Sequence, residues 1–88
     1  MDYRSSETET EKVISMQKKS RDDFLKTISS NLHQMREDLG ISLNELSSVV
    51  GIHPNTLMNY EWGKTMPSAY NLYLIANYYG CDYEELLD

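Results

Sequence analysis

Two asparagines, Asn55 and Asn59, are the residues whose type and spacing most directly indicate a chemistry. They lie four positions apart, so a helix over residues 54–62 would place both side chains on one face. A carboxamide donates and accepts hydrogen bonds, and it matches the N6 and N7 groups at the edge of adenine. The alternative is that both are ordinary solvent-exposed polar residues. The choice depends on the elements that position these side chains.

The sequence offers little to a catalytic mechanism. His33 has no neighbouring nucleophile, and His53 precedes a proline, where a helix cap explains it better. No glycine-rich phosphate loop and no histidine, cysteine and aspartate cluster is present. The single cysteine, Cys81, can neither form an internal disulfide nor build a thiolate metal site. We therefore expect no enzyme activity, no metal site and no cofactor.

The composition describes one small domain with a short extension. The 88 residues are 40% hydrophobic and 25% charged, which is typical of a folded chain. No apolar run approaches the ~20 residues that span a bilayer, and the amino end lacks the apolar stretch of a secretory signal. With one cysteine, the chain suits a reducing compartment, and we expect a cytoplasmic protein.

The net charge of −6 has the wrong sign for a simple nucleic-acid binder. Residues 1–30 are balanced, whereas residues 31–88 carry only Arg36 and Lys64 against eight acidic residues. A polyanion would have to be met by a few well-placed groups. The basic cluster Lys12, Lys18, Lys19, Arg21 and Lys26 could supply some of them, or it could be an ordinary solvated helix face.

Apolar spacing and helix caps predict an all-α fold of five helices. Residues 1–20 form a polar extension, helical or partly mobile, with a weaker helical pattern over residues 9–19. The domain over residues 21–88 contains the five helices. Ser42 with Glu45 forms a capping box, and Pro54 suits the first position of a helix. The expected helices are 21–39, 43–50, 54–62, 69–79 and 83–87.

The most specific pattern lies in residues 43–62. Two short helices that meet at a sharp turn need apolar inward positions, one small residue at the crossing and a permissive residue in the turn. Ser47 is the small residue, and Gly51 can take a positive φ at little cost. The inward apolar set is Leu46, Val50, Ile52, Leu57 and Tyr60. The pattern predicts a helix-turn-helix motif.

The chain also resembles a known family, the Cro/phage-repressor type of helix-turn-helix domain, often called the xenobiotic-response-element family. The resemblance covers about residues 28–87. It implies a five-helix repressor-like domain from a bacterium or phage. It further implies a sequence-specific DNA-binding transcriptional regulator, acting as a homodimer on a pseudo-palindromic operator. The matching segments are Arg36 to Ser42, Glu45-Leu46, Val50-Gly51-Ile52, Tyr60 to Lys64, Pro67-Ser68, Leu72, Ile75-Ala76 and Leu86-Leu87.

The same resemblance implies roles for individual residues. Arg36 and Glu61 would form an internal ion pair, and Lys64 would contact the DNA backbone. The fourth and fifth helices would form the dimer interface, with Tyr70, Tyr79 and Tyr83 as candidates. The residues expected to contact DNA are Ser42, Leu43, His53, Pro54, Asn55, Thr56, Met58, Asn59 and Lys64.

An alternative function remains within the same fold, namely an acidic helix-turn-helix module that binds another protein, such as an antirepressor or an assembly factor. Three features favour it. Residues 54–62 contain no arginine or lysine, Leu43 stands where the family commonly has glutamine, and the chain holds seven tyrosines. Tyrosine is common at protein contacts because it is large, rigid and half polar.

Overall fold

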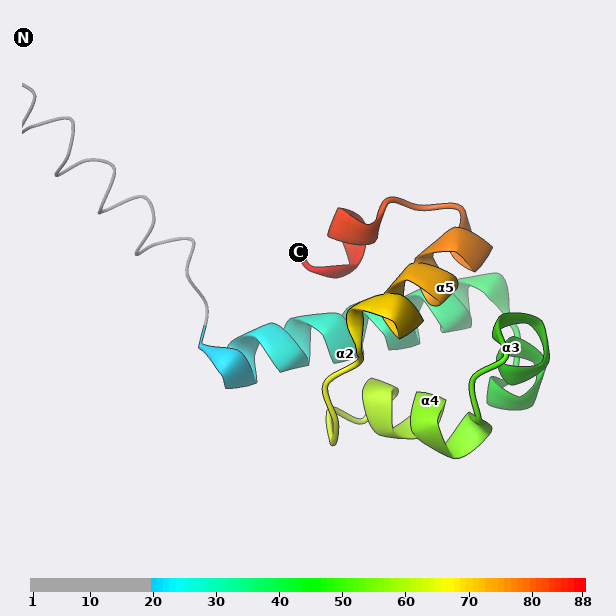
Figure 1. The fold of residues 1–88 in the computed structure, drawn as a ribbon, viewed down its shortest axis with the longest axis horizontal. Helices are drawn as coiled ribbons and strands as arrows, with labels where there is room; N and C mark the ends of the chain where they lie inside the picture. Colours follow the sequence, from blue (N-terminus) through cyan, green and yellow to red (C-terminus); the bar gives the residue numbers. More distant parts are fainter. Residues whose placement is uncertain (1–19) are drawn as a thin grey trace, which may run out of the picture.

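The computed structural model describes residues 20–88, and this part of the chain contains helices and no strand. The α-helices are α2 (Arg21–Leu39), α3 (Leu43–Val50), α4 (Pro54–Glu61) and α5 (Ala69–Tyr79), and a 3₁₀ helix, η1 (Tyr83–Leu86), follows them (Figure 1). The predicted all-α class is confirmed. The expected extension, with its helical pattern over residues 9–19, lies outside the described residues except for Ser20.

The last predicted helix differs from expectation, because residues 83–86 form a 3₁₀ helix. The Glu85 N–H donates to the Asp82 carbonyl at 2.9 Å and the Leu87 N–H to the Glu84 carbonyl at 3.0 Å, both with the three-residue spacing of a 3₁₀ turn. Helical segments of three or four residues commonly adopt this tighter geometry. The described residues therefore form four α-helices and not five.

Side-chain caps fix where the helices begin. Ser20, Ser42 and Ser68 each accept a hydrogen bond from the backbone N–H three residues ahead, and they open α2, α3 and α5. At α4 the cap is the ring of His53, whose Nδ1 accepts from the Asn55 N–H at 3.1 Å. Pro54 occupies the first position, where a missing N–H costs nothing. These short polar signals are readable in the sequence.

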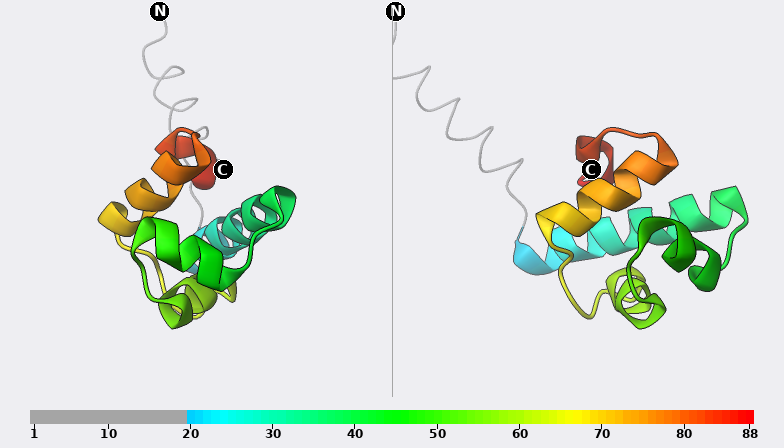
Figure 2. Two further views of the ribbon diagram at one scale, coloured as in Figure 1. Left: turned by 90° about the vertical axis from the view of Figure 1, so that its right-hand side faces the viewer. Right: turned by 45° about the vertical axis from the view of Figure 1, so that its right-hand side comes forward.

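The core lies where the four α-helices and η1 meet. α2 packs against α4 and η1, and α3 packs against α4 and α5. The five apolar residues predicted to point inward from the helix-turn-helix segment are all buried, with Leu46 and Leu57 each 2% exposed. At the turn between α3 and α4, Gly51 has a φ of +76°. Figures 1 and 2 place α4 and η1 on opposite sides of the molecule in every view.

No helix within residues 20–88 is both long and apolar enough to cross a membrane.

Candidate nucleic-acid interface

The two asparagines of α4 lie on the outer side of the helix-turn-helix. Asn55 is exposed and Asn59 is half-buried. Their backbones are held, because the Asn55 N–H donates to His53 and the Asn59 carbonyl accepts from the Lys64 N–H at 2.9 Å. Neither side-chain amide has a hydrogen-bond partner within residues 20–88. Both amides are therefore available to another molecule from a fixed backbone.

The remaining predicted contacts on α4 form an uncharged surface. His53 is exposed, whereas Pro54, Thr56 and Met58 are half-buried. The one charged residue of α4 is Glu61, and its side chain is only 4% exposed. The outer face of α4 can therefore offer amide, hydroxyl and apolar contacts, with no charge of its own.

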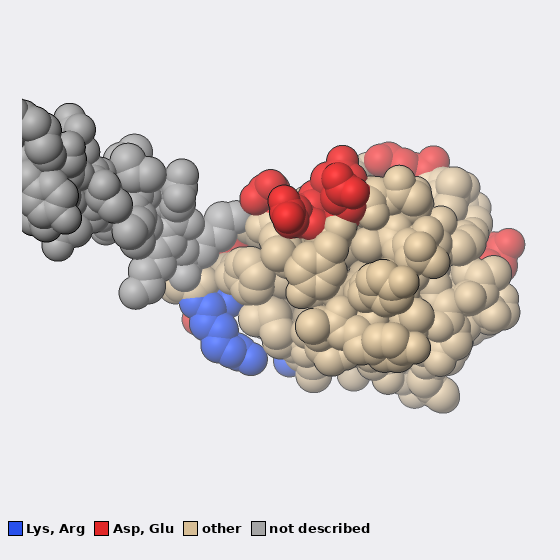
Figure 3. Space-filling view, turned by 45° about the horizontal axis from the view of Figure 1, so that its top comes forward, with Lys and Arg blue, Asp and Glu red and all other residues tan. Residues whose placement is uncertain are grey.

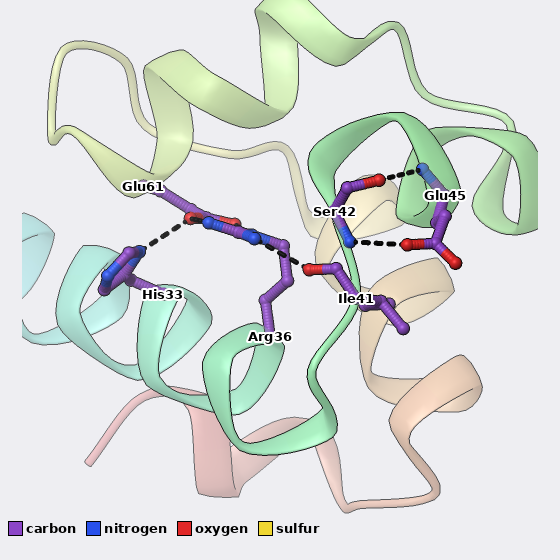
Figure 4. A network of polar contacts seen from close by, with 6 residues as sticks. All are labelled: His33, Arg36, Ile41, Ser42, Glu45 and Glu61. Carbon is purple, nitrogen blue, oxygen red and sulfur yellow. Dashed lines mark hydrogen bonds and ion pairs between the residues drawn. The ribbon is translucent and has the colours of Figure 1, made fainter.

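The start of α3 offers fewer free backbone N–H groups to an anion than expected. The Ser42 Oγ accepts from the Glu45 N–H at 3.0 Å, and the Ser42 N–H donates to the Glu45 carboxylate at 2.9 Å (Figure 4). This capping box consumes two N–H groups and places a carboxylate at the helix end. The N–H groups of Leu43 and Asn44 have no partner among the described residues. The Leu43 side chain packs against the core.

Arg36 and Glu61 form a bidentate ion pair between α2 and the end of α4. The Arg36 Nε lies 2.8 Å from Glu61 Oε2 and its Nη2 lies 3.0 Å from Oε1, while Nη1 donates to the Ile41 carbonyl at 2.8 Å (Figure 4). Their side chains are 13% and 4% exposed. The hydrogen bond to Glu61 raises the pKa of Arg36. The guanidinium is thus committed within the protein and unavailable to a ligand.

His33 is a third member of this network that the sequence did not reveal. Its Nδ1 lies 2.9 Å from Glu61 Oε1, while its side chain remains 52% exposed. The signal that could have found it is its spacing of three from Arg36, which places both side chains on one face of α2. Two residues of α2 therefore hold the last residue of α4.

Lys64 and Trp62 form a pair just beyond α4. The Lys64 Nζ lies 5.0 Å from the centre of the Trp62 ring, within the range of a cation–π contact. The Trp62 side chain is 63% exposed, which is unusual for so large an apolar group. Sequence reasoning treated Trp62 only as the end of a helix.

The tyrosines divide into surface and core residues. Tyr70 is 67% exposed and stacks on Tyr73, with ring centres 6.4 Å apart, while Tyr83 is 37% exposed. Tyr79 differs from expectation: it packs against the core, and its buried hydroxyl has no partner. Burial raises the pKa of Tyr79 to about 12. Its ring is thus committed mainly to the core, whereas Tyr73 and Tyr78 are exposed tyrosines of α5 that were not predicted as contacts.

The exposed tyrosines of α5 lie on a helix that contains no charged residue. Figure 3 shows a broad uncharged area between acidic side chains along one edge and basic side chains beside the start of the described chain. This area therefore offers no cation to a phosphate backbone.

Comparison with known proteins agrees with this geometry. A protein family described as "Helix-turn-helix domain" matches residues 30–88. The fold is similar to the crystal structure of an HTH_3 family transcriptional regulator from Vibrio cholerae, with a TM-score of 0.71 and 22% identity. That match covers 76% of this chain and 38% of the other, so the chain spans well under half of that regulator. No curated protein matches the sequence.

Proposed function

The chain belongs to the helix-turn-helix domain family, and from this we propose that it is a sequence-specific DNA-binding transcriptional regulator of the repressor-like kind. In this proposal α4 lies in the major groove and occupancy of an operator controls transcription, with no chemical step. The operator is pseudo-palindromic because two copies of the chain bind it together.

One observation carries the proposal, namely the two unpartnered amides on a helix that the rest of the domain holds rigidly. An α-helix with its side chains is about 10–12 Å across, so α4 fits the ~12 Å width of the major groove. The capping by His53 at one end and the Arg36–Glu61 pair at the other fix its position. Asn55 and Asn59 then present paired donors and acceptors to base edges.

Backbone contacts in this proposal come from few groups. They are the N–H groups of Leu43 and Asn44 at the start of α3 and the ammonium of Lys64. Because each neutralised phosphate contributes about −0.9 to the slope of log K against log salt, few contacts give a shallow slope. We expect a slope much smaller in magnitude than the roughly −10 of a regulator that makes many phosphate contacts.

The test is selection of bound duplexes from a random library with the full chain, followed by fluorescence anisotropy across a salt series. The proposal predicts an enriched two-fold motif and binding that weakens as salt rises. If no motif is enriched and no salt-dependent binding occurs at low salt, the regulator function is wrong.

A matched pair of variants assigns the base contact. Asn55→Ala should cost about 1–3 kcal/mol of binding and relax the preference at one base position. Gln34→Ala is the control, since Gln34 carries an exposed amide on α2. It should leave both affinity and preference unchanged. An equal loss on every sequence would mean that Asn55 contacts only the backbone.

The homodimer in this proposal uses the exposed face of α5. Tyr70 and Tyr73 form a stacked aromatic pair on a helix without charges, and Tyr83 is exposed on the neighbouring η1. Two copies related by a two-fold axis would place their α4 helices in successive major grooves, about 34 Å apart. The half-site spacing in the selected motif tests this arrangement.

The same α5 face favours a second candidate function, docking of a different protein by an acidic helix-turn-helix module. The observation behind it is that α5 exposes Tyr70 and Tyr73 without any charged residue, while α4 contributes no cation. Absence of a DNA motif together with an intact fold would favour this function over the first.

A further inference from the structure

Trp62 and Lys64 lie in the tight turn that follows α4, and backbone hydrogen bonds hold this turn against the helix. The Trp62 N–H donates to the Met58 carbonyl at 2.9 Å, and the Lys64 N–H donates to the Asn59 carbonyl at 2.9 Å. Between them, Gly63 takes a φ of +72°, which reverses the chain at little cost. The backbones of both residues are therefore fixed relative to α4.

The Lys64 side chain has no partner of opposite charge among the described residues. Residues 20–88 contain four cationic side chains, of which Arg36 is held by Glu61. Lys64 is exposed, and no carboxylate within these residues lies at ion-pair distance from its ammonium. Its contact is instead the Trp62 ring, whose centre lies 5.0 Å from Nζ. The ammonium thus keeps its full charge for another molecule.

The Trp62 ring contributes little to the core. Its side chain is 63% exposed and is not a member of the core cluster, although it borders a groove that Leu25 and Ser29 also line. The end of α4 uses only the backbone of residue 62, which most other residues could supply. The choice of tryptophan here is therefore better explained by the contact of its ring with the Lys64 ammonium.

An aromatic face acts on a lysine differently from a carboxylate. A carboxylate would neutralise the ammonium, whereas an indole face attracts it through the ring quadrupole and leaves the positive charge in place. The flexible four-carbon stem of a lysine loses rotamer freedom when its ammonium binds an anion. A stem that is already held over a ring has less freedom to lose, so it should bind a phosphate more tightly.

We propose that Trp62 is a positioning residue, whose ring holds the Lys64 ammonium beside the end of α4 for contact with a phosphate of the DNA strand. This inference rests on the proposed function, because it needs a bound duplex. It adds a residue that acts through Lys64 and reads no base.

The contact itself is testable in the free protein by nuclear magnetic resonance. Because the current in an aromatic ring shifts protons above its face upfield, the ε-methylene protons of Lys64 should resonate upfield of their usual position. Trp62→Leu should return them to that position. Lys64 protons that already have their usual shift in the parent protein would overturn the proposal.

Fluorescence anisotropy with a selected duplex tests the role in binding. Trp62→Leu removes the aromatic face, so affinity should fall about two- to fivefold for each bound subunit, which corresponds to an exposed cation–π contact. In a Lys64→Gln background the same substitution should have no further effect. Trp62→Phe keeps an aromatic face and should retain most of the parent affinity.

The salt dependence separates positioning from loss of charge. Lys64→Gln should reduce the magnitude of the slope of log K against log salt by about 1 per subunit. Trp62→Leu should leave the slope unchanged, because the ammonium is still present and still reaches the phosphate. Its midpoint of urea denaturation should equal that of the parent, since the ring lies outside the core.

Arg21 supplies the matched control, since it is another exposed cation but lies on α2. The effects of Arg21→Gln and Trp62→Leu on affinity should be additive. An equal loss from Trp62→Leu with and without the Lys64 ammonium, as damage to the fold would produce, overturns the positioning role while duplex binding and the proposed function stand. Failure of the parent chain to bind any duplex overturns both.

Discussion

Among single residues, Glu61 joins more parts of this small domain than its position at the end of α4 suggests. Its two carboxylate oxygens contact Arg36 and His33 from α2, and Arg36 continues the network to the Ile41 carbonyl just before α3 (Figure 4). Taking these groups out of water is costly unless all are satisfied, and here they are. The orientation of the proposed reading helix therefore depends on one buried carboxylate.

Removal of the Glu61 carboxylate should strongly destabilise the fold. Glu61→Ala strands a guanidinium that is 13% exposed, so we expect a loss of about 3 kcal/mol in the free energy of unfolding, measured by urea denaturation. Glu37→Ala removes an exposed carboxylate from the same region and should change the free energy by less than about 0.5 kcal/mol. Equal effects of the two variants would contradict a structural role for the pair.

Removal of the unpartnered hydroxyl of Tyr79, in contrast, should not lower stability near neutral pH. Tyr79→Phe removes a buried polar group that has no hydrogen bond, so stability near neutral pH should stay equal or rise by up to about 1 kcal/mol. Burial raises the pKa of Tyr79 from 10.0 to about 12, so the folded state keeps a proton that the unfolded state releases between those values. Stability must then fall as pH rises through this window.

The Tyr79→Phe variant should lack the part of the alkaline decrease in stability that comes from ionisation of Tyr79. Urea titrations at neutral pH and in the alkaline window measure it, and Tyr73→Phe serves as the control because Tyr73 is 54% exposed. A Tyr79→Phe protein with the same alkaline fall as the parent would show that this hydroxyl does not titrate differently on folding.

The scale of elements shows what short polar signals can and cannot specify. The caps at Ser42, His53 and Ser68 follow from the sequence, because each depends on side chains within three residues of the helix start. The 3₁₀ geometry of residues 83–86 did not follow, because Asp82 and Glu85 form a capping box that can open either kind of helix. The link from His33 to Glu61 spans 28 positions and depends on how α2 and α4 pack.

The turn after α4 allows a prediction with an internal control. Gly63 and Gly40 both have a φ of +72°, so alanine at either position should cost about 1–2 kcal/mol. At Gly63 a Cβ would also meet the Ser29 Oγ at 3.3 Å, whereas at Gly40 nothing lies within 4 Å. Thermal or urea unfolding should therefore rank Gly63→Ala as the more destabilising of the two.

The additional loss of stability of Gly63→Ala over Gly40→Ala should shrink when the Ser29 hydroxyl is removed. In a Ser29→Ala background the two glycine substitutions should become nearly equal, since only the shared backbone cost remains. An excess that persists unchanged in that background would assign it to something other than the Ser29 contact.

At the scale of the whole molecule, charge and apolar surface are separated. Figure 3 shows acidic side chains along one edge, basic side chains beside the start of the described chain and an uncharged area between them, and α5 itself carries no charged residue. The net charge of −6 thus hides a polarised surface. The sequence could not reveal this arrangement, because it depends on how α2, α4 and α5 pack in the folded chain.

If the chain dimerises through the exposed tyrosines of α5, a charge introduced there should weaken self-association. Tyr70→Asp should weaken self-association by about 2 kcal/mol or more, because it places a charge in the centre of an uncharged contact. Sedimentation equilibrium over a concentration series measures the change. Tyr78→Asp, on the same helix but outside the stacked pair, is the control. A parent chain that stays monomeric at all concentrations would contradict the α5 dimer.

The core-facing positions of α4 are distinct from the positions proposed to contact DNA, so binding preference can be altered separately from packing. Leu57 and Tyr60 face the core and carry the packing, while the amides of the exposed Asn55 and the half-buried Asn59 have no hydrogen-bond partner among the described residues. A library randomised at these two positions should consist almost wholly of folded proteins. New recognition could then arise, in the laboratory or by descent, without any repair of the scaffold beneath it.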